Sequence, residues 1–329
     1  MTGSPWMLSL ATLTLTGALA AHGSNDHPPA GRDTATTMSP DSAATTPAAA
    51  AGPTTVEGFE HPESVKYDAE LDVWYVANIK GSPFDKDGNG YISRLKGDGS
   101  VDSLKFIVGG VDGVELDGPK GMALQGDTIW VADITNLRGL NRRTGQPVAS
   151  IAVQGAKFLN DVTVGEDGIY VTDTGTEAAK NGMSHTGPDR VYRIGPKHDV
   201  SVAIQSDSLA GPNGITWDDA GRRFIVVPFM GKTILTWTPG AKQVTTLGTT
   251  KGQLDGVEML DGGRVLFTSW ADSTLDVLDN GTVTTVSTGL PSPADIGVDT
   301  KRGRVAIPLL LQNRVEFRRL PAEKGVGAS

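Results

Sequence analysis

The sequence predicts an all-β fold, a six-bladed β-propeller with a metal site in its central channel. A short motif occurs six times: Pro or Leu, a mostly polar residue, a small or turn-forming residue, then an apolar residue that opens an alternating run. The second positions of the six copies are Glu63, Lys120, Asn160, Asn213, Asp255 and Ala294. They are 57, 40, 53, 42 and 39 residues apart. One four-stranded blade has this length, so six copies predict six blades closed around an axis.

Each motif is followed by strand patterns in the same order. Alternation of β-branched and aromatic residues between Gly and Asp marks half-buried strands at 72–77, 127–132, 168–172 and 264–268. Looser third and fourth strands follow in each repeat. No helical pattern of similar length competes, and a β-sandwich is the weaker alternative.

The last repeat is one strand short. Residues 293–320 contain three strand patterns, at 296–299, 304–307 and 314–318. We therefore expect residues 54–59 to complete that blade, which joins the two ends of the chain in one sheet and protects its edges. The propeller is predicted to span residues 54–320, with a flexible tail at 321–329.

The amino terminus predicts export. Residues 7–21 are rich in Leu, Ala and Thr and end in Ala18-Leu19-Ala20-Ala21, the small-residue form of a signal-peptidase site. This apolar stretch is short for a membrane span. Residues 1–21 are therefore interpreted as a signal peptide and residues 22–53, rich in Ala, Thr and Pro, as a disordered linker. The expected location is the periplasm or the cell exterior.

Composition limits the partners. The 29 basic and 38 acidic residues give a net charge of −9, and no dense Lys/Arg block is present. Nucleic acid and anionic membrane surfaces are therefore not expected as partners. The chain has no cysteine, which excludes disulfides, thiolate catalysis and Cys-based metal sites. We expect a monomer that acts on a small molecule.

The repeated polar positions predict a metal site. In a propeller the start of each innermost strand faces the axis, so Glu63, Lys120, Asn160, Asn213 and Asp255 should meet there. Two carboxylates and two amides form an oxygen set that suits Ca²⁺, with Mg²⁺, Mn²⁺ and Zn²⁺ as alternatives. Asn, Asp and Gly beside Pro are also ordinary turn formers. Glu63 fits that simpler explanation poorly, because Glu is not a favoured turn residue.

Four of these motifs carry a family resemblance. The segments Pro62–Val65, Leu159–Val162, Gly211–Ile215 and Leu254–Val257, in this order at blade spacing, resemble the SMP-30/gluconolactonase family of six-bladed propellers. More distantly, the chain is similar to the diisopropylfluorophosphatase and paraoxonase type of hydrolase. The resemblance covers about residues 56–320.

The resemblance implies a divalent metal, usually Ca²⁺, held at the bottom of the channel. It assigns Glu63, Asn213 and Asp255 as ligands, and Asn160 as either a ligand or a substrate contact. Phe158 stands where sugar-lactone members have Arg, and Lys120 stands where paraoxonase-like members have His. These departures put recognition of polyhydroxylated lactones and a His-centred base in question.

The predicted activity is metal-assisted opening of a lactone or ester, with Asp255 as base or nucleophile. Lys120 either neutralises the carboxylates or contacts substrate, and Lys120 and Asp295 are expected to be water-exposed charges that orient it. Phe158 and Asn160 are further expected substrate contacts, and Trp270 could wall the channel mouth. The alternative is a non-enzymatic NHL-like binding module with a structural metal. A propeller-fold lyase is a third possibility, for which no base is evident.

One further motif invites a metal assignment. Residues 85–92 match the first half of an EF-hand loop, but Lys96 occupies the twelfth position and no flanking helices are evident. A hairpin turn on the rim is the preferred interpretation, with weak Ca²⁺ binding as the alternative. His61 is a minor candidate for a rim residue.

Overall fold

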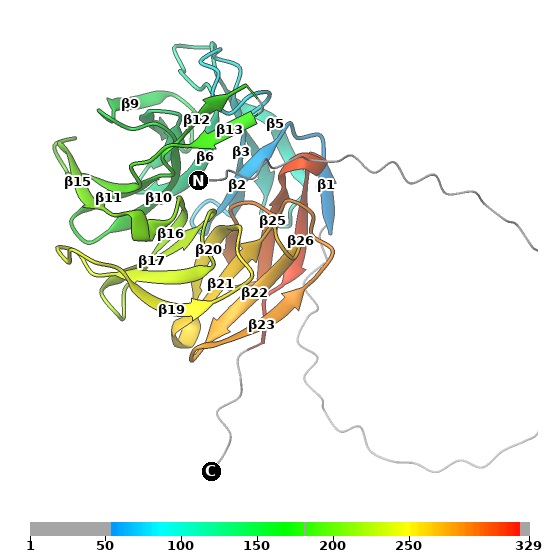
Figure 1. The fold of residues 1–329 in the computed structure, drawn as a ribbon. Coiled ribbons are helices and arrows are strands. Elements are labelled where there is room, and N and C mark those ends of the chain that lie inside the picture. The colour runs from blue at the N-terminus through cyan, green and yellow to red at the C-terminus, as the bar shows by residue number, and fades with distance from the viewer. Residues whose placement is uncertain (1–53, 181, 323–329) are drawn as a thin grey trace, which may run out of the picture. The chain divides into compact units, whose positions relative to one another are not determined.

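The computed structural model describes residues 54–180 and 182–322, and these form six four-stranded antiparallel sheets around one axis (Figure 1). The all-β six-bladed propeller predicted from the repeats is therefore confirmed. The predicted signal peptide, the predicted linker and residues 323–329 of the predicted tail lie outside the described residues. Within the described ranges, no helix is long and apolar enough to cross a membrane.

The first three blades run in chain order from the axis outward. Blade one contains β2 (Pro62–Asp68), β3 (Val73–Asn78), β4 (Tyr91–Lys96) and β5 (Val101–Val108). Blade two contains β6 (Pro119–Gln125), β7 (Thr128–Asp133), β8 (Asn136–Asn141) and β9 (Pro147–Ala152). Blade three contains β10 (Leu159–Gly165), β11 (Gly168–Asp173), β14 (Arg190–Ile194) and β15 (Val200–Gln205), with an inserted hairpin of β12 (Thr176–Ala179) and β13 (Gly182–His185).

The other three blades follow the same plan. Blade four contains β16 (Pro212–Asp218), β17 (Arg223–Pro228), β18 (Thr233–Trp237) and β19 (Thr245–Thr249). Blade five contains β20 (Leu254–Leu260), β21 (Arg264–Ser269), β22 (Thr274–Asp279) and β23 (Thr282–Ser287). Blade six contains β24 (Gly297–Asp299), β25 (Arg304–Leu309), β26 (Arg314–Arg319) and β1 (Thr55–Glu57). Short 3₁₀ turns are η1 (Asp207–Leu209), η2 (Asp261–Gly263) and η3 (Leu310–Gln312).

Blade six is closed by the start of the described chain. Strand β1 pairs antiparallel with β26, and Val56 lies opposite Val315. In Figure 1 the blue strand β1 accordingly lies beside the red strand β26. Val56 and Phe59 are buried in a cluster with Phe317 and with residues of blade one. The predicted pairing of residues 54–59 with the last repeat is thus present.

The hydrophobic core lies between the blades. Among the described residues, each of six buried clusters combines side chains from two neighbouring blades. Burial decreases outward within a blade: β3 is almost wholly buried, whereas β5 is mostly exposed or half-buried. This gradient explains why the inner strands have the clearer alternating pattern and the outer strands the looser one.

A β-bulge lies at the start of each innermost strand in blades one to five. The register with the second strand shifts just after Pro62, Pro119, Leu159, Pro212 and Leu254. A bulge places an extra residue in one strand and re-aims the side chains beside it. The polar motif positions lie within these bulges, so the bulges help to determine where their side chains point.

Candidate active site

One end of the channel contains a cavity of about 230 Å³ whose lining includes all five polar motif positions. Glu63, Lys120, Asn160, Asn213 and Asp255 come from the innermost strands β2, β6, β10, β16 and β20, and all five are buried. The structure therefore brings together side chains that are nearly 200 residues apart in sequence. Predicted contacts Phe158 and Trp270 line the same cavity.

The five motif residues form the floor of this cavity. Acidic residues at the ends of the second strands fix the loops that precede this floor. The Asp133 carboxylate accepts hydrogen bonds from the Asp117 and Gly118 backbone N–H groups at 3.0 and 2.8 Å. The Asp173 carboxylate accepts one from the Phe158 N–H at 2.9 Å. Because these bonds fix the backbone just before Lys120 and Asn160, the two side chains are positioned by the neighbouring strand of their own blade.

The Asn160 amide is oriented by Thr174. The Thr174 hydroxyl donates to the Pro212 carbonyl at 2.9 Å, so its proton is already used. It accepts a hydrogen bond from Asn160 Nδ2 at 3.1 Å. With its amino group held in this way, Asn160 has its carbonyl oxygen left to serve as an acceptor or a ligand.

The two floor carboxylates are only partly compensated, because the charge of Lys120 lowers the pKa of Glu63 less than burial and the neighbouring carboxylates raise it. Burial, followed by the nearby charges of Asp255 and Asp295, raises the pKa of Glu63 well above its ordinary value. Burial and Asp295 likewise raise the pKa of Asp255. Glu63 Oε2 and Asp255 Oδ1 are buried and have no hydrogen-bond partner among the described residues. A buried carboxylate oxygen without a partner is costly, and a bound cation would relieve that cost.

Lys120 is the one cation on this floor within the described residues. Its Nζ donates to the Gly118 carbonyl at 2.9 Å and lies 4.4 Å from the centre of the Phe158 ring. Burial lowers the pKa of Lys120 to about 8, although the charges of Glu63 and Asp133 favour the protonated form. The Phe158 ring therefore packs against the Lys120 ammonium.

The position of Asp295 differs from the one predicted from the sequence. It was expected to be a water-exposed charge facing substrate, but it is buried and does not line the cavity. Lys120 is also fully buried, so the expectation of exposed charges was wrong for both residues. The Asp295 carboxylate accepts hydrogen bonds from Ser64 Oγ at 2.5 Å and Lys66 Nζ at 3.2 Å. Asp295 directly follows Ala294, the motif position of blade six, so it lies one residue further along the innermost part of that blade.

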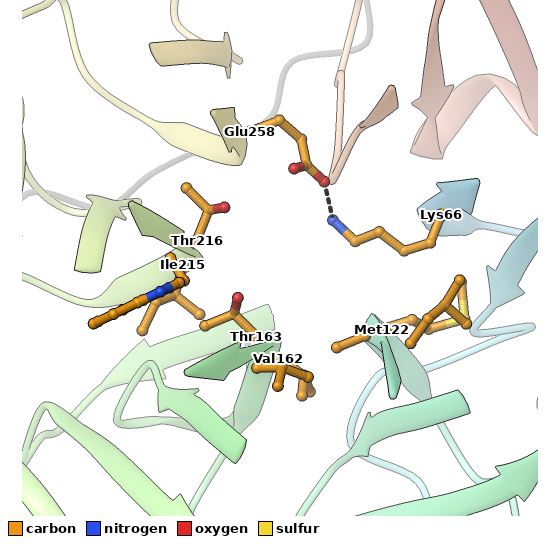
Figure 2. A pocket seen from close by; sticks show the side chains of 11 residues that line it. Lys66, Met122, Val162, Thr163, Ile215, Thr216 and Glu258 are labelled. Atoms are coloured by element: carbon orange, nitrogen blue, oxygen red, sulfur yellow. Dashed lines mark hydrogen bonds and ion pairs between the residues drawn. The ribbon is translucent and has the colours of Figure 1, made fainter. Parts of the chain in front are cut away.

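A second cavity, of about 310 Å³, lies toward the other end of the innermost strands. Figure 2 shows Lys66 reaching across it to Glu258, with Met122, Thr163 and Thr216 around them. The Lys66–Glu258 ion pair is 2.8 Å long. Burial opposes the charged form of Lys66, but the negative charges of Asp295 and Glu258 outweigh the effect of burial and raise the pKa of Lys66. Lys66 is thus fully engaged by protein oxygens.

The walls of the first cavity include Trp270, which was predicted to wall the channel mouth, and several residues that the sequence analysis did not indicate. Ile79, Thr174, Phe229, Trp270 and Leu310 each directly follow the second strand of a blade and line the cavity. They share one repeat position, and comparing that position along the chain with Trp270 could have identified the other four. Met183, from the inserted hairpin, has no equivalent in the other blades. His61 lines the cavity as well, which agrees with its minor place among the predicted rim residues.

The EF-hand-like segment occupies a hairpin loop. Residues 85–90 form the second half of the loop that joins β3 to β4, which pair antiparallel. Gly88 N–H donates to the Asp117 carboxylate at 2.9 Å, and Asp87 accepts from Asn89. The segment therefore forms the predicted hairpin loop, stabilised by its own Asp87 and by Asp117 from the loop before β6.

The sequence matches the model of the SMP-30/gluconolactonase/LRE-like region over residues 89–295, more than half of its 329 residues. The chain belongs to this family. The resemblance inferred from the four motifs is confirmed, and the match includes the motif positions from Lys120 to Asp255. No curated protein matches the sequence.

Solved structures share the fold of this SMP-30/gluconolactonase/LRE-like protein at low identity. A structural genomics target provisionally described as a gluconolactonase has 15% identity and a TM-score of 0.60, covering 82% of this chain and 92% of its own. A gluconolactonase from Xanthomonas campestris has 16% identity and a TM-score of 0.58, covering 80% and 88%. Virginiamycin B lyase from Staphylococcus aureus has 13% identity and a TM-score of 0.56, covering 81% and 98%. At such identities the likeness establishes the fold alone.

The floor of this SMP-30/gluconolactonase/LRE-like protein suits a hard cation. Within residues 54–180 and 182–322, no three acidic or histidine side chains converge as a metal cluster, so a metal here depends on the amide oxygens as well. Two carboxyl groups with unpartnered oxygens and two asparagines offer four oxygen donors, and a charge of −2 when both carboxyl groups are ionised. This donor set fits Ca²⁺ or Mg²⁺ better than a soft metal.

Proposed function

We propose that this protein is an exported, metal-dependent hydrolase that opens a lactone or carboxylic ester. The observation that carries the proposal is the pair of buried carboxylates, Glu63 and Asp255, each with an unpartnered oxygen on the floor of a channel cavity. Membership of the gluconolactonase family supports a lactone or ester as the substrate.

In this proposal Glu63, Asn160, Asn213 and Asp255 hold a divalent cation, with Ca²⁺ preferred. When bound, such an ion polarises the substrate carbonyl and stabilises the negative charge that develops on its oxygen. Burial of the floor excludes water and strengthens these electrostatic effects.

Asp255 then has one of two roles. As a base, its carboxylate accepts a proton from water while the water oxygen bonds to the carbonyl carbon; the ring C–O bond breaks and the proton passes to the leaving alkoxide. As a nucleophile, its oxygen bonds to the carbonyl carbon itself, the C–O bond of the lactone or ester breaks, and the leaving alkoxide takes a proton from water. Water or hydroxide then adds to the acyl carbon, the bond between that carbon and the Asp255 oxygen breaks, and the product acid and the free carboxylate are released. Lys120 holds positive charge beside the floor in either case.

The proposal is tested by metal reconstitution. After chelation, addition of Ca²⁺, Mg²⁺, Mn²⁺ or Zn²⁺ is followed by thermal melting and by hydrolysis of sugar lactones, γ- and δ-lactones and aryl esters. We expect a raised melting temperature together with turnover that needs the metal. Stabilisation without turnover would favour the NHL-like binding module, and no response to any metal would refute the metal site.

Export is proposed from the amino-terminal pattern alone. Cleavage after Ala20 or Ala21 is expected when the full-length protein is produced in a bacterium with a periplasm. Mass spectrometry of the periplasmic fraction identifies the mature amino terminus, and an uncleaved protein confined to the cytoplasm would contradict the proposal.

A further inference from the structure

We infer that the substrate carries an apolar alkyl or aryl group next to its lactone or ester and is not a polyol, an inference that rests on the proposed function. The cavity has a polar floor and largely apolar walls. Its walls include Ile79, Pro83, Phe158, Phe229 and Leu310. The indole of Trp270 packs edge-on against Phe229, with ring centres 5.5 Å apart, and continues the apolar surface.

The mouth of the cavity is also apolar. Met183, Met230 and Leu311 line it and are 52%, 45% and 52% exposed. Apart from four valines, these are all of the large exposed hydrophobic side chains among the described residues. They come from three different blades, in the hairpin strand β13, after β17 and in η3. Exposed apolar side chains gathered at one cavity indicate a binding surface for an apolar ligand.

The polar groups available above the floor are few. Thr174 and Thr176 line one side, but the Thr174 hydroxyl is already bonded to Pro212 and Asn160. No arginine lines the cavity among the described residues, and Lys120 is held by Gly118 and Phe158. Beyond the floor residues and Thr174, the polar side-chain groups of the described lining are His61, Thr176 and the indole N–H of Trp270. Most hydroxyls of a bound sugar lactone would face the apolar walls and lose water without gaining a partner, which is unfavourable.

The size of the cavity sets the size of the group. An apolar cavity of about 150 Å³ is enough to hold a benzene ring. The cavity of about 230 Å³ therefore accommodates a small lactone ring with a short chain. A longer chain reaches the apolar rim formed by Met183, Met230 and Leu311.

The test compares unsubstituted and alkyl-substituted lactones on the metal-loaded full-length protein. kcat/KM is measured for γ-butyrolactone, γ-hexalactone, γ-octalactone, γ-decalactone and glucono-δ-lactone. We expect kcat/KM to rise about fourfold for each added methylene until the cavity is filled, and glucono-δ-lactone to be a poorer substrate than γ-octalactone. A preference for glucono-δ-lactone, or no dependence on chain length, would overturn the inference while leaving the proposed hydrolase intact.

Rim substitutions locate the effect. Met230→Asn and Leu311→Asn should lower kcat/KM for γ-decalactone about tenfold and for γ-butyrolactone much less, because only the long chain reaches the rim. Val148→Asn, an exposed valine that does not line the cavity, is the matched control and should leave the whole series unchanged. Equal losses along the series in the rim variants would contradict the placement of the chain.

Calorimetry separates the inference from the proposed function. If no lactone or ester is turned over, the proposed hydrolase fails, and the dissociation constants of the γ-lactone series for the metal-loaded protein then decide the inference. Tighter binding with chain length supports an apolar ligand site. A flat series, or tighter binding of glucono-δ-lactone, refutes it.

Discussion

At the scale of single residues, the feature that matters most is the unpaired state of two buried carboxylates. Glu63 and Asp255 lie on a floor where burial raises their pKa values, and one oxygen of each lacks a hydrogen-bond partner among the described residues. Buried acidic residues at the ends of the second strands of other blades have hydrogen-bond partners. Asp133 and Asp173, for example, are buried but accept several backbone N–H groups. The contrast distinguishes candidate ligands from residues that hold loops.

Replacement of Asp255 by Asn tests its chemical role. The amide has almost the same shape, so the fold should be retained, but it cannot act as a base or nucleophile. We expect kcat to fall by about 10³-fold or more, measured on the best lactone of the panel. Asp261→Asn, at an exposed position in η2, is the control and should be neutral. Retained activity in the Asp255 variant would remove this residue from the mechanism.

At the scale of the strand, the bulges and the glycines beside them form the channel together. Gly121, Gly214 and Gly256 directly follow the motif positions of blades two, four and five. A Cβ on Gly121 would lie 2.3 Å from Asp161 Oδ1 and 2.4 Å from Asp161 Cα. Neighbouring innermost strands can therefore approach this closely only because these positions lack side chains.

Gly121→Ala should consequently destabilise the protein. Forcing a methyl group against the backbone of β10 is expected to lower the free energy of unfolding by about 2–3 kcal/mol, as measured by urea denaturation. Gly118→Ala is a milder comparison, since its Cβ would meet the Pro83 carbonyl oxygen at 3.3 Å. Equal stability of the two variants would show that the strands can separate without cost.

The ion cluster further along the channel is a second feature at this scale. Lys66 pairs with Glu258 and with Asp295, whose side chain is only 3% exposed. Lys66→Met would leave the Asp295 carboxylate buried without its counter-ion, and should lower the free energy of unfolding by about 3–5 kcal/mol. Lys251→Met removes an exposed ion pair with Asp272 and should lower the free energy of unfolding by less than about 1 kcal/mol, with both variants measured by urea denaturation. A similarly small loss of unfolding free energy in both variants would show that the buried carboxylates do not need Lys66 as a counter-ion.

At the scale of the whole molecule, stability depends on closure of the ring. Blade six joins β1 from the start of the described chain to β26 near its end. It also meets blade one at the axis, where Asp295 N–H donates to the Glu63 carbonyl at 2.9 Å and Val65 N–H donates to the Asp295 carbonyl at 3.1 Å. Closure therefore fixes the backbone of a candidate ligand as well as the last sheet.

Deletion of residues 54–59 tests this closure. The deletion removes β1 and the buried side chains of Val56 and Phe59. Loss of two buried side chains, worth about 1.5–3 kcal/mol each, should lower the melting temperature by about 10 °C or more. Val56→Ala, which keeps the strand, should lie between the deletion and the intact protein. An unchanged melting temperature would show that the ring does not need this strand.

Much of the architecture was determined by the sequence alone, because a propeller repeats one local pattern. The six motif copies predicted the number of blades, the inner strands and the convergence of Glu63, Lys120, Asn160, Asn213 and Asp255. The same register placed Ala294 at the sixth position. Periodicity alone was enough here, since equivalent positions in a closed ring of similar blades must face the same axis.

Only the tertiary structure decided the surroundings of those residues. Apolar residues such as Phe229 and Leu310 look like ordinary core residues in the sequence, and they become cavity walls because the second strand of each blade ends beside the channel. Asp295 carries the same charge as Asp255, yet a shift of one residue takes it out of the cavity and next to Lys66. Composition and spacing predict which residues meet. Burial and the partners of each atom, which determine the chemistry, depend on how the blades pack.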